Sequence, residues 1–140
     1  MLSLVYRPLV TGTSARYLFD VQTGRLVLAN ANGTNGAVCY YDGVWKYSTT
    51  ANSLGWKLVE FHLVPGGTST ITVNGVLQTL SATTFANLAI GGAITIASNY
   101  DGSAGFFNGW IGEIRIYTSA LSAGDITSER TFLNTKWSVY

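Results

Sequence analysis

Aromatic side chains beside neutral polar ones are the residues of this sequence whose types and spacing suit sugar recognition. An aromatic ring covers the apolar face of a sugar, while amide and carboxylate groups bond to its hydroxyls. One such group lies in a turn-rich stretch near residue 100, and a second surrounds the Asp42-Gly43 turn. The pattern predicts glycan contacts at six residues, namely Tyr40, Trp45, Asn99, Tyr100, Asp101 and Asn108.

Core packing is the alternative role for these rings, because aromatic side chains bury a large apolar area. Neighbouring side chains of a strand point to opposite faces. One ring of the Tyr40-Tyr41 pair, and one ring of Phe106-Phe107, should therefore face outward. An outward ring serves a sugar or another protein chain equally well, and the sequence leaves both alternatives open.

Catalytic groups are sparse. Glu60 and His62 share a strand face, but no Ser or Cys nucleophile accompanies them, and a polar surface pair is the simpler interpretation.

Glycoside cleavage needs two carboxylates roughly 5 to 10 Å apart, and no strand carries acidic residues at i and i+2 or i+4. Asp125 and Glu129 are four apart, but at the start of an expected helix, where negative charge favours the helix itself. One His and one Cys exclude a four-ligand zinc site. We expect no catalytic residue and no enzyme.

Ten short strands separated by Gly, Asn, Asp and Ser turns would position these residues. They are expected at 3–9, 16–20, 25–29, 37–41, 44–47, 54–64, 69–74, 76–79, 89–97 and 106–117. Ser122 and Asp125 have the spacing of a capping box, which predicts a helix from about Ser122 to about Lys136.

The period-2 pattern also predicts which side chains face the core. In strand 54–64 the inward set is Val59, Phe61 and Leu63. In strand 89–97 it is Ile90, Gly92, Ile94 and Ile96. Strict alternation in strand 106–117 places Trp110, Gly112, Ile114 and Ile116 on one face and Ile111, Glu113, Arg115 and Tyr117 on the other.

Two segments together resemble the concanavalin A-like, laminin-G-like jelly-roll modules. The first reads W-x-x-V-x-F from Trp56, then a Pro-Gly-Gly turn, then I-x-V-N-G from Ile71. The second reads F-x-G-x-I-G-E-I-R-I-Y-x-x-A-L-S-x-x-D-I from Phe107. The resemblance covers residues 54–137 well and the first fifty loosely. It implies an all-β, antiparallel two-sheet jelly-roll sandwich with one short C-terminal helix, formed as a single domain over 1–140.

The resemblance carries further expectations. Modules of this type often bind calcium through loop oxygens, which implies calcium at Asp101, joined by Asp42 or Asp20, with an ordinary Asp-Gly turn as the alternative. The Glu-x-Asp-x-x-Glu pattern of the related glucanases is absent. The family modules usually have one or two strands before the one that strand 3–9 matches. We therefore expect either a sandwich that closes with fewer strands or an adjacent chain that supplies a strand across an open edge.

The charge content of the sequence limits the kinds of partner that the protein can bind. Charged residues make up 11% of the chain, against about 25% in an average soluble domain, and the formal net charge is +1. Weak repulsion between copies predicts a subunit of a homo-oligomer or other assembly. Scattered basic residues argue against nucleic acid, and no apolar run approaches the roughly 20 residues that insert into a membrane. Cys39 reads as a small buried hydrophobe.

These observations predict a non-enzymatic adhesion or structural module. The family resemblance and the low charge place it in a virion, as a phage capsid decoration or tail subunit, or at an extracellular or cell-surface location. It would contact other protein subunits and glycans. The alternative is a dedicated carbohydrate-binding lectin domain in which calcium is optional.

Overall fold

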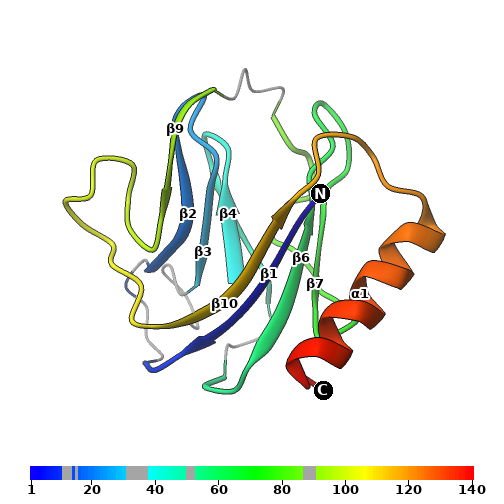
Figure 1. Cartoon of the computed structure of the whole chain (residues 1–140). Coiled ribbons are helices and arrows are strands. Elements are labelled where there is room, and N and C mark those ends of the chain that lie inside the picture. The colour runs from blue at the N-terminus through cyan, green and yellow to red at the C-terminus, as the bar shows by residue number, and fades with distance from the viewer. Residues whose placement is uncertain (11–13, 15, 31–37, 50–52, 87–90) are drawn as a thin grey trace.

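The computed structural model describes residues 1–10, 14, 16–30, 38–49, 53–86 and 91–140. These ranges hold ten strands and a C-terminal helix (Figure 1). The strands are β1 (Leu2–Pro8), β2 (Arg16–Thr23), β3 (Val27–Asn30), β4 (Val38–Tyr41), β5 (Trp45–Tyr47), β6 (Lys57–His62), β7 (Thr70–Val73), β8 (Val76–Leu77), β9 (Gly91–Ile96) and β10 (Gly109–Ile116); the helix is α1 (Ala123–Trp137).

The strands form two antiparallel sheets that pack face to face. Sheet A has the order β10-β1-β6-β7-β8, and sheet B has the order β5-β4-β3-β2-β9. Figure 1 shows β10 and β9 along the same side of the sandwich, and α1 outside sheet A. This architecture confirms the predicted antiparallel sandwich with one C-terminal helix.

The core lies between the sheets. Strand β6 shows how the pattern builds it, because Val59 and Phe61 are fully buried in the core and Leu63 packs against it, as predicted. Tyr6 and Leu4 of β1 and Leu28 of β3 contribute to the same cluster. Burying side chains of this kind contributes roughly 1.5–3 kcal/mol each.

Helix α1 covers the outer face of sheet A. Leu133 packs with Val5 and Leu58 in a second cluster, which Trp56 and Trp137 border. The same interface buries Glu60, whose carboxylate accepts a 2.8 Å hydrogen bond from the Arg130 guanidinium. Burial raises the pKa of Glu60, and Arg130 opposes that rise. Glu60 is thus a helix-docking residue, and the interpretation of Glu60 and His62 as a polar surface pair is wrong.

The predicted capping box is present at the start of α1. The Ser122 hydroxyl accepts from the Asp125 amide at 3.1 Å, and the Asp125 carboxylate accepts from the Ser122 amide at 3.3 Å. These bonds satisfy amides that have no partner within the helix. Within the described ranges, no helix has both the length and the apolar character needed to cross a membrane.

Strand β10 departs from the strict alternation predicted for it. Tyr6 of β1 pairs with Ile111, but its neighbour Val5 pairs with Glu113, so Gly112 is an extra residue in β10. Such a β-bulge shifts the side-chain phase by one. Ile111 therefore points inward together with Ile114, while Trp110 points outward with Glu113, so the predicted faces of both Trp110 and Ile111 are wrong.

A close contact with α1 explains the glycine at the bulge. A Cβ atom at Gly112 would lie 2.9 Å from the Trp137 ring. The indole packs where a side chain would otherwise stand, because only glycine leaves room for it. The helix and the bulge are thus packed against each other.

Strand β9 keeps the predicted phase at Ile94 and Ile96 but not at Gly92, because a register shift between Val21 and Thr23 pairs Thr23 with Gly91 and breaks the alternation there. Ile94 and Ile96 pair with Val21 and Phe19, whose side chains are in the core, so both isoleucines face inward. Ile90 lies outside the described residues.

Candidate functional site

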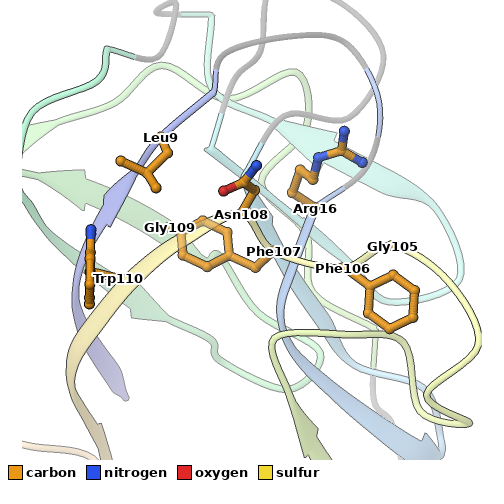
Figure 2. A pocket seen from close by; sticks show the side chains of 8 residues that line it. All are labelled: Leu9, Arg16, Gly105, Phe106, Phe107, Asn108, Gly109 and Trp110. Carbon is orange, nitrogen blue, oxygen red and sulfur yellow. The ribbon is translucent and has the colours of Figure 1, made fainter.

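An open pocket of about 570 Å³ lies where β1 ends and β10 begins (Figure 2). Three parts of the chain that are far apart in the sequence meet here: the end of β1, the start of β2 and the segment leading into β10. The lining residues are Leu9, Arg16, Gly105, Phe106, Phe107, Asn108, Gly109 and Trp110. We refer to this as the Trp110 pocket.

Trp110 forms one end of the pocket. Its side chain is 61% exposed, an unusual state for the largest apolar ring in a protein. The β10 bulge produces this exposure by turning the residue to the outer face. On that face its cross-strand partner is Arg7, which is also exposed. Arg7 and Trp110 therefore occupy neighbouring positions on the outer face of sheet A.

Phe106 forms the other end, across the labelled side chains from Trp110 in Figure 2. It is 58% exposed, whereas its neighbour Phe107 packs edge-on against the Tyr6 ring at a centroid distance of 5.6 Å. The Phe107 amide also donates to the Ala97 carbonyl at 2.8 Å. Phe107 anchors the segment in the core, and its neighbour is left facing solvent, as the alternation argument predicted.

Asn108 supplies an exposed amide between these two rings. Its backbone carbonyl accepts the Leu9 amide at 2.9 Å, which holds the two walls of the pocket together. Gly109 makes this approach possible, because a Cβ there would lie 2.3 Å from the Arg7 carbonyl oxygen. The predicted contact Asn108 is thus in the pocket with its side chain available.

Arg16 brings a positive charge to the pocket from the first position of β2. All seven carboxylate side chains of the chain lie within the described ranges. Five of them form ion pairs: Asp20 with Arg25, Asp42 with Lys46, Glu60 with Arg130, Glu129 with Arg115, and Glu113 with Arg115 and Lys136. No ion pair of the described residues includes Arg7 or Arg16. The Arg16 guanidinium, which lines the pocket, is therefore available to an anionic group that enters it, and Arg7 lies on the neighbouring strand opposite Trp110.

None of the described residues that line the pocket is acidic. Glycoside hydrolysis requires a general acid and a second carboxylate on either side of the scissile bond. The described lining therefore offers ring faces, an amide and a cation, which are groups for binding.

Tyr40 lies elsewhere. It is fully buried in the core, with its ring edge-on to Phe85 at 6.0 Å. Burial raises the pKa of its phenol to about 12. Because it has no accessible surface, we leave Tyr40 out of the candidate site.

Trp45 and Tyr100 belong to a second surface, on the outer face of sheet B. The Trp45 ring stacks on Tyr17 at 6.2 Å and meets Tyr41 at 5.2 Å. The Arg25 guanidinium lies over both Tyr41 and Tyr100, at 5.8 and 5.3 Å from the ring centroids. We call these five side chains the aromatic row. It unites two of the predicted residues but leaves Asn108 apart from them.

Asn99 stabilises the loop before the pocket. Its side chain is largely buried; the amide donates to the Ser103 hydroxyl at 3.2 Å, and the carbonyl accepts the Ala104 amide at 2.9 Å. These bonds hold the loop closed, which leaves the Asn99 amide little capacity for a ligand.

Asp101 sits exposed in the same loop and accepts the Ser103 amide at 2.9 Å. Hydrogen bonds from Ser103, that of the hydroxyl first, lower the pKa of Asp101. The expected calcium partners are engaged elsewhere, Asp20 by the Tyr100 amide and Asp42 by Lys46 and the Ala86 amide. Across the described ranges, no group of three or more His, Cys, Asp or Glu side chains is placed to share a metal ion. The geometry at Asp101 is that of the Asp-Gly turn alternative.

Sequence reasoning missed Trp110 and Arg16. A glycine inside a strand pattern can mark a bulge, so Gly112 was the available signal that Trp110 would change face. Arg16 carries no such local signal, because its place in the pocket depends on how β2 meets the loop before β10.

Comparison with known protein families identifies the superfamily of this chain. A family model described as the concanavalin A-like lectin/glucanases superfamily matches residues 2–127. The chain belongs to this superfamily. Comparison with curated proteins by sequence returns no match.

A solved structure shares the architecture. The carbohydrate-binding module CBM40 of the Ruminococcus gnavus IT-sialidase superposes with a TM-score of 0.54 at 13% sequence identity. The match covers 92% of this chain and 80% of the module. At 13% identity the likeness shows a shared fold only, and it does not show that the two proteins share binding residues.

Proposed function

We propose that this concanavalin A-like domain is a non-catalytic carbohydrate-binding module that holds a sugar in the Trp110 pocket. The observation that carries the proposal is the pair of exposed rings, Trp110 and Phe106, on either side of a cavity that also presents Arg16 and Asn108. A ring face shields the C–H surface of a sugar, and the polar groups between the rings fix its hydroxyls.

The CBM40 likeness supports this proposal, because that solved structure is itself a carbohydrate-binding module. It favours the second function considered from the sequence, a dedicated lectin domain, over a virion or cell-surface structural subunit. The superfamily also includes glucanases, but the described pocket lining contains no acidic residue, which favours binding over cleavage.

The charge of the pocket points to a class of ligand. Arg16 lines the cavity and Arg7 lies beside Trp110, and no described carboxylate neutralises either of them. A guanidinium binds a carboxylate through two parallel hydrogen bonds, which are roughly twice as strong as bonds between neutral groups. The module should therefore prefer glycans with a carboxylate-bearing sugar to neutral glycans.

Binding to an array of neutral and carboxylate-bearing glycans, followed by calorimetry on the best ligand, tests the proposal. Trp110→Ala and Phe106→Ala should each weaken binding by about fivefold or more, because a stacked ring contributes on the order of 1 kcal/mol or above. Both rings are exposed, so circular dichroism should show an unchanged fold. Tyr100→Ala, in the aromatic row, is the matched control and should retain the affinity of the unsubstituted chain.

Two results would contradict the proposal. Loss of binding in Tyr100→Ala with full binding in Trp110→Ala would move the site to the aromatic row. Release of sugar from oligosaccharides by the unsubstituted chain would show that the domain is an enzyme.

A further inference from the structure

Asn108 of the Trp110 pocket is followed directly by Gly109. The Asn108 side chain is exposed, and within the described part of the chain it forms no hydrogen bond (Figure 2). Glycine has no side chain that would hinder the approach of its own nitrogen to the preceding side chain. The pair therefore offers an amide group and a backbone nitrogen that could react with each other.

The Gly109 nitrogen points away from β1. Leu9 donates to the Asn108 carbonyl at 2.9 Å, so these two residues are a hydrogen-bonded pair, and Gly109 lies opposite Pro8 at the next position. Hydrogen-bonded and non-hydrogen-bonded pairs alternate in an antiparallel ladder, so the Gly109 N–H faces the other side of β10. Strand β10 is an edge strand of sheet A, and the Gly109 nitrogen therefore takes no part in the sheet.

We propose that Asn108 is a deamidation site, and that its conversion to a carboxylate changes the ligand preference of the Trp110 pocket as the protein ages. The effect on ligand preference rests on the proposed glycan function. The chemical step depends only on the geometry of Asn108 and Gly109.

The reaction consumes water and releases ammonia. The Gly109 nitrogen loses its proton to base and bonds to the Asn108 side-chain carbon Cγ, and the amide nitrogen leaves as ammonia. Water then adds to one of the two carbonyl carbons of the resulting cyclic imide and breaks its bond to the Gly109 nitrogen. The products at position 108 are aspartate or isoaspartate, and both carry a new carboxylate.

One contact opposes ring closure. Asn108 lies just outside β10, but its carbonyl must turn and release the Leu9 amide. A hydrogen bond between neutral backbone groups changes an equilibrium by at most about tenfold. The Leu9 contact should therefore slow the reaction without preventing it.

Asn74 and Gly75 form the same pair in a protected place. The Asn74 side-chain oxygen accepts the Leu58 amide at 3.0 Å, and the Asn74 amide donates to the Leu58 carbonyl at 2.8 Å. A Cβ at Gly75 would lie 3.1 Å from the Tyr140 hydroxyl oxygen, so the C-terminal residue packs against this turn. Asn74 should therefore react more slowly than Asn108, and it serves as an internal control.

A carboxylate at position 108 would share the pocket with Arg16. It would attract the guanidinium that is otherwise available to a ligand, and it would repel a ligand carboxylate. A hydrogen bond to a charged group is strong enough that its loss lowers affinity by about tenfold or more. Affinity for a carboxylate-bearing glycan should fall by that factor, and affinity for a neutral glycan should change less.

Peptide mapping by mass spectrometry, after incubation of the folded chain at mildly alkaline pH, tests the chemical step. The peptide with Asn108 should gain the mass that replaces –NH2 by –OH and should contain isoaspartate, while the peptide with Asn74 should stay largely unchanged. Mapping is needed because the Asn-Gly pairs at 32–33 and 35–36 lie outside the described residues. An intact Asn108, or equal conversion of Asn74 and Asn108, would overturn the proposal.

Calorimetry with one carboxylate-bearing and one neutral glycan tests the effect on binding. Freshly prepared Asn108→Asp should bind the first glycan about tenfold or more weakly than the unsubstituted chain. The unsubstituted chain should lose affinity in step with its modified fraction. Asn108→Gln should keep its own starting affinity through the same incubation, because the longer side chain closes a ring more slowly.

The two experiments separate the two claims. A fresh chain that binds neither glycan would contradict the proposed function, and the peptide map would still decide whether Asn108 is modified. Undiminished binding of the carboxylate-bearing glycan by Asn108→Asp would overturn the predicted change in preference.

Discussion

The guanidinium of Arg16 lines a pocket whose described lining residues include no carboxylate, so we expect its charge to act on a ligand that enters the pocket. Arg16→Met keeps the length of the side chain and removes the charge. A hydrogen bond to a charged group contributes about 1.5–3 kcal/mol, so affinity for a carboxylate-bearing glycan should fall by at least about tenfold. Affinity for a neutral glycan should change little. Calorimetry with one ligand of each class measures this, and an equal loss for both would mean that Arg16 shapes the pocket without selecting charge.

Glu113 is one of the residues that connect sheet A to α1. Its carboxylate accepts a 2.7 Å hydrogen bond from the Trp137 indole and forms ion pairs with Lys136 and Arg115. The Trp137 bond, followed by those from Lys136 and Arg115, lowers the pKa of Glu113 to about 2 from an ordinary 4.5. A lowered pKa means that the folded state favours the ionised carboxylate.

This shift predicts an acid dependence of stability. The contribution of Glu113 is fully present above the unfolded-state pKa and is lost as the pH falls from about 4.5 to about 2. Glu113→Gln should lower the free energy of unfolding at neutral pH and flatten its decline over that interval. Urea titrations of both chains at several pH values measure the effect. Parallel curves for the two chains would place the acid response in other residues.

At the scale of the element, the close contact between the β10 bulge and α1 should make Gly112 intolerant of a side chain. In Gly112→Ala the new Cβ would lie 2.9 Å from the Trp137 ring, so the indole must move. Overpacking of this kind costs roughly 1–3 kcal/mol. Gly124→Ala is the control, because its Cβ would meet the Ser122 hydroxyl oxygen at an ordinary 3.7 Å inside a helix. Thermal unfolding should show a loss of stability in the first variant and none in the second.

Local sequence rules predicted the elements well where one interaction decides them. The capping box gave the start of α1, because hydroxyl and carboxylate bonds to free amides act over a few residues. The alternation of Val59 and Phe61 gave the inner face of β6, since burial enforces a period of two. The same rule failed in β10, where packing against Trp137 admits an extra residue.

For the whole molecule, the candidate site was predicted only in part. Asn108 and the outward ring of Phe106-Phe107 followed from local pattern. The place of Arg16 did not follow from local pattern, because Arg16 and Asn108 line the same pocket only after sheet B, which contains β2, packs on sheet A, which contains β10. Tyr40 was predicted as a ligand contact, but β4 directs Tyr40 into the core and Tyr41 outward. Composition alone does not decide which residue of the pair faces the core.

The bulge at Gly112 also divides β10 into two parts that contact different regions of the molecule. Residues before it, including Gly109 and Trp110, belong to the pocket, while Glu113 and Arg115 after it hold α1. Changes at 106, 108 and 110 therefore leave the helix-bearing part of the strand as it is. If the proposed glycan site is correct, a designed library confined to those positions should change ligand preference without changing the fold, as circular dichroism would show.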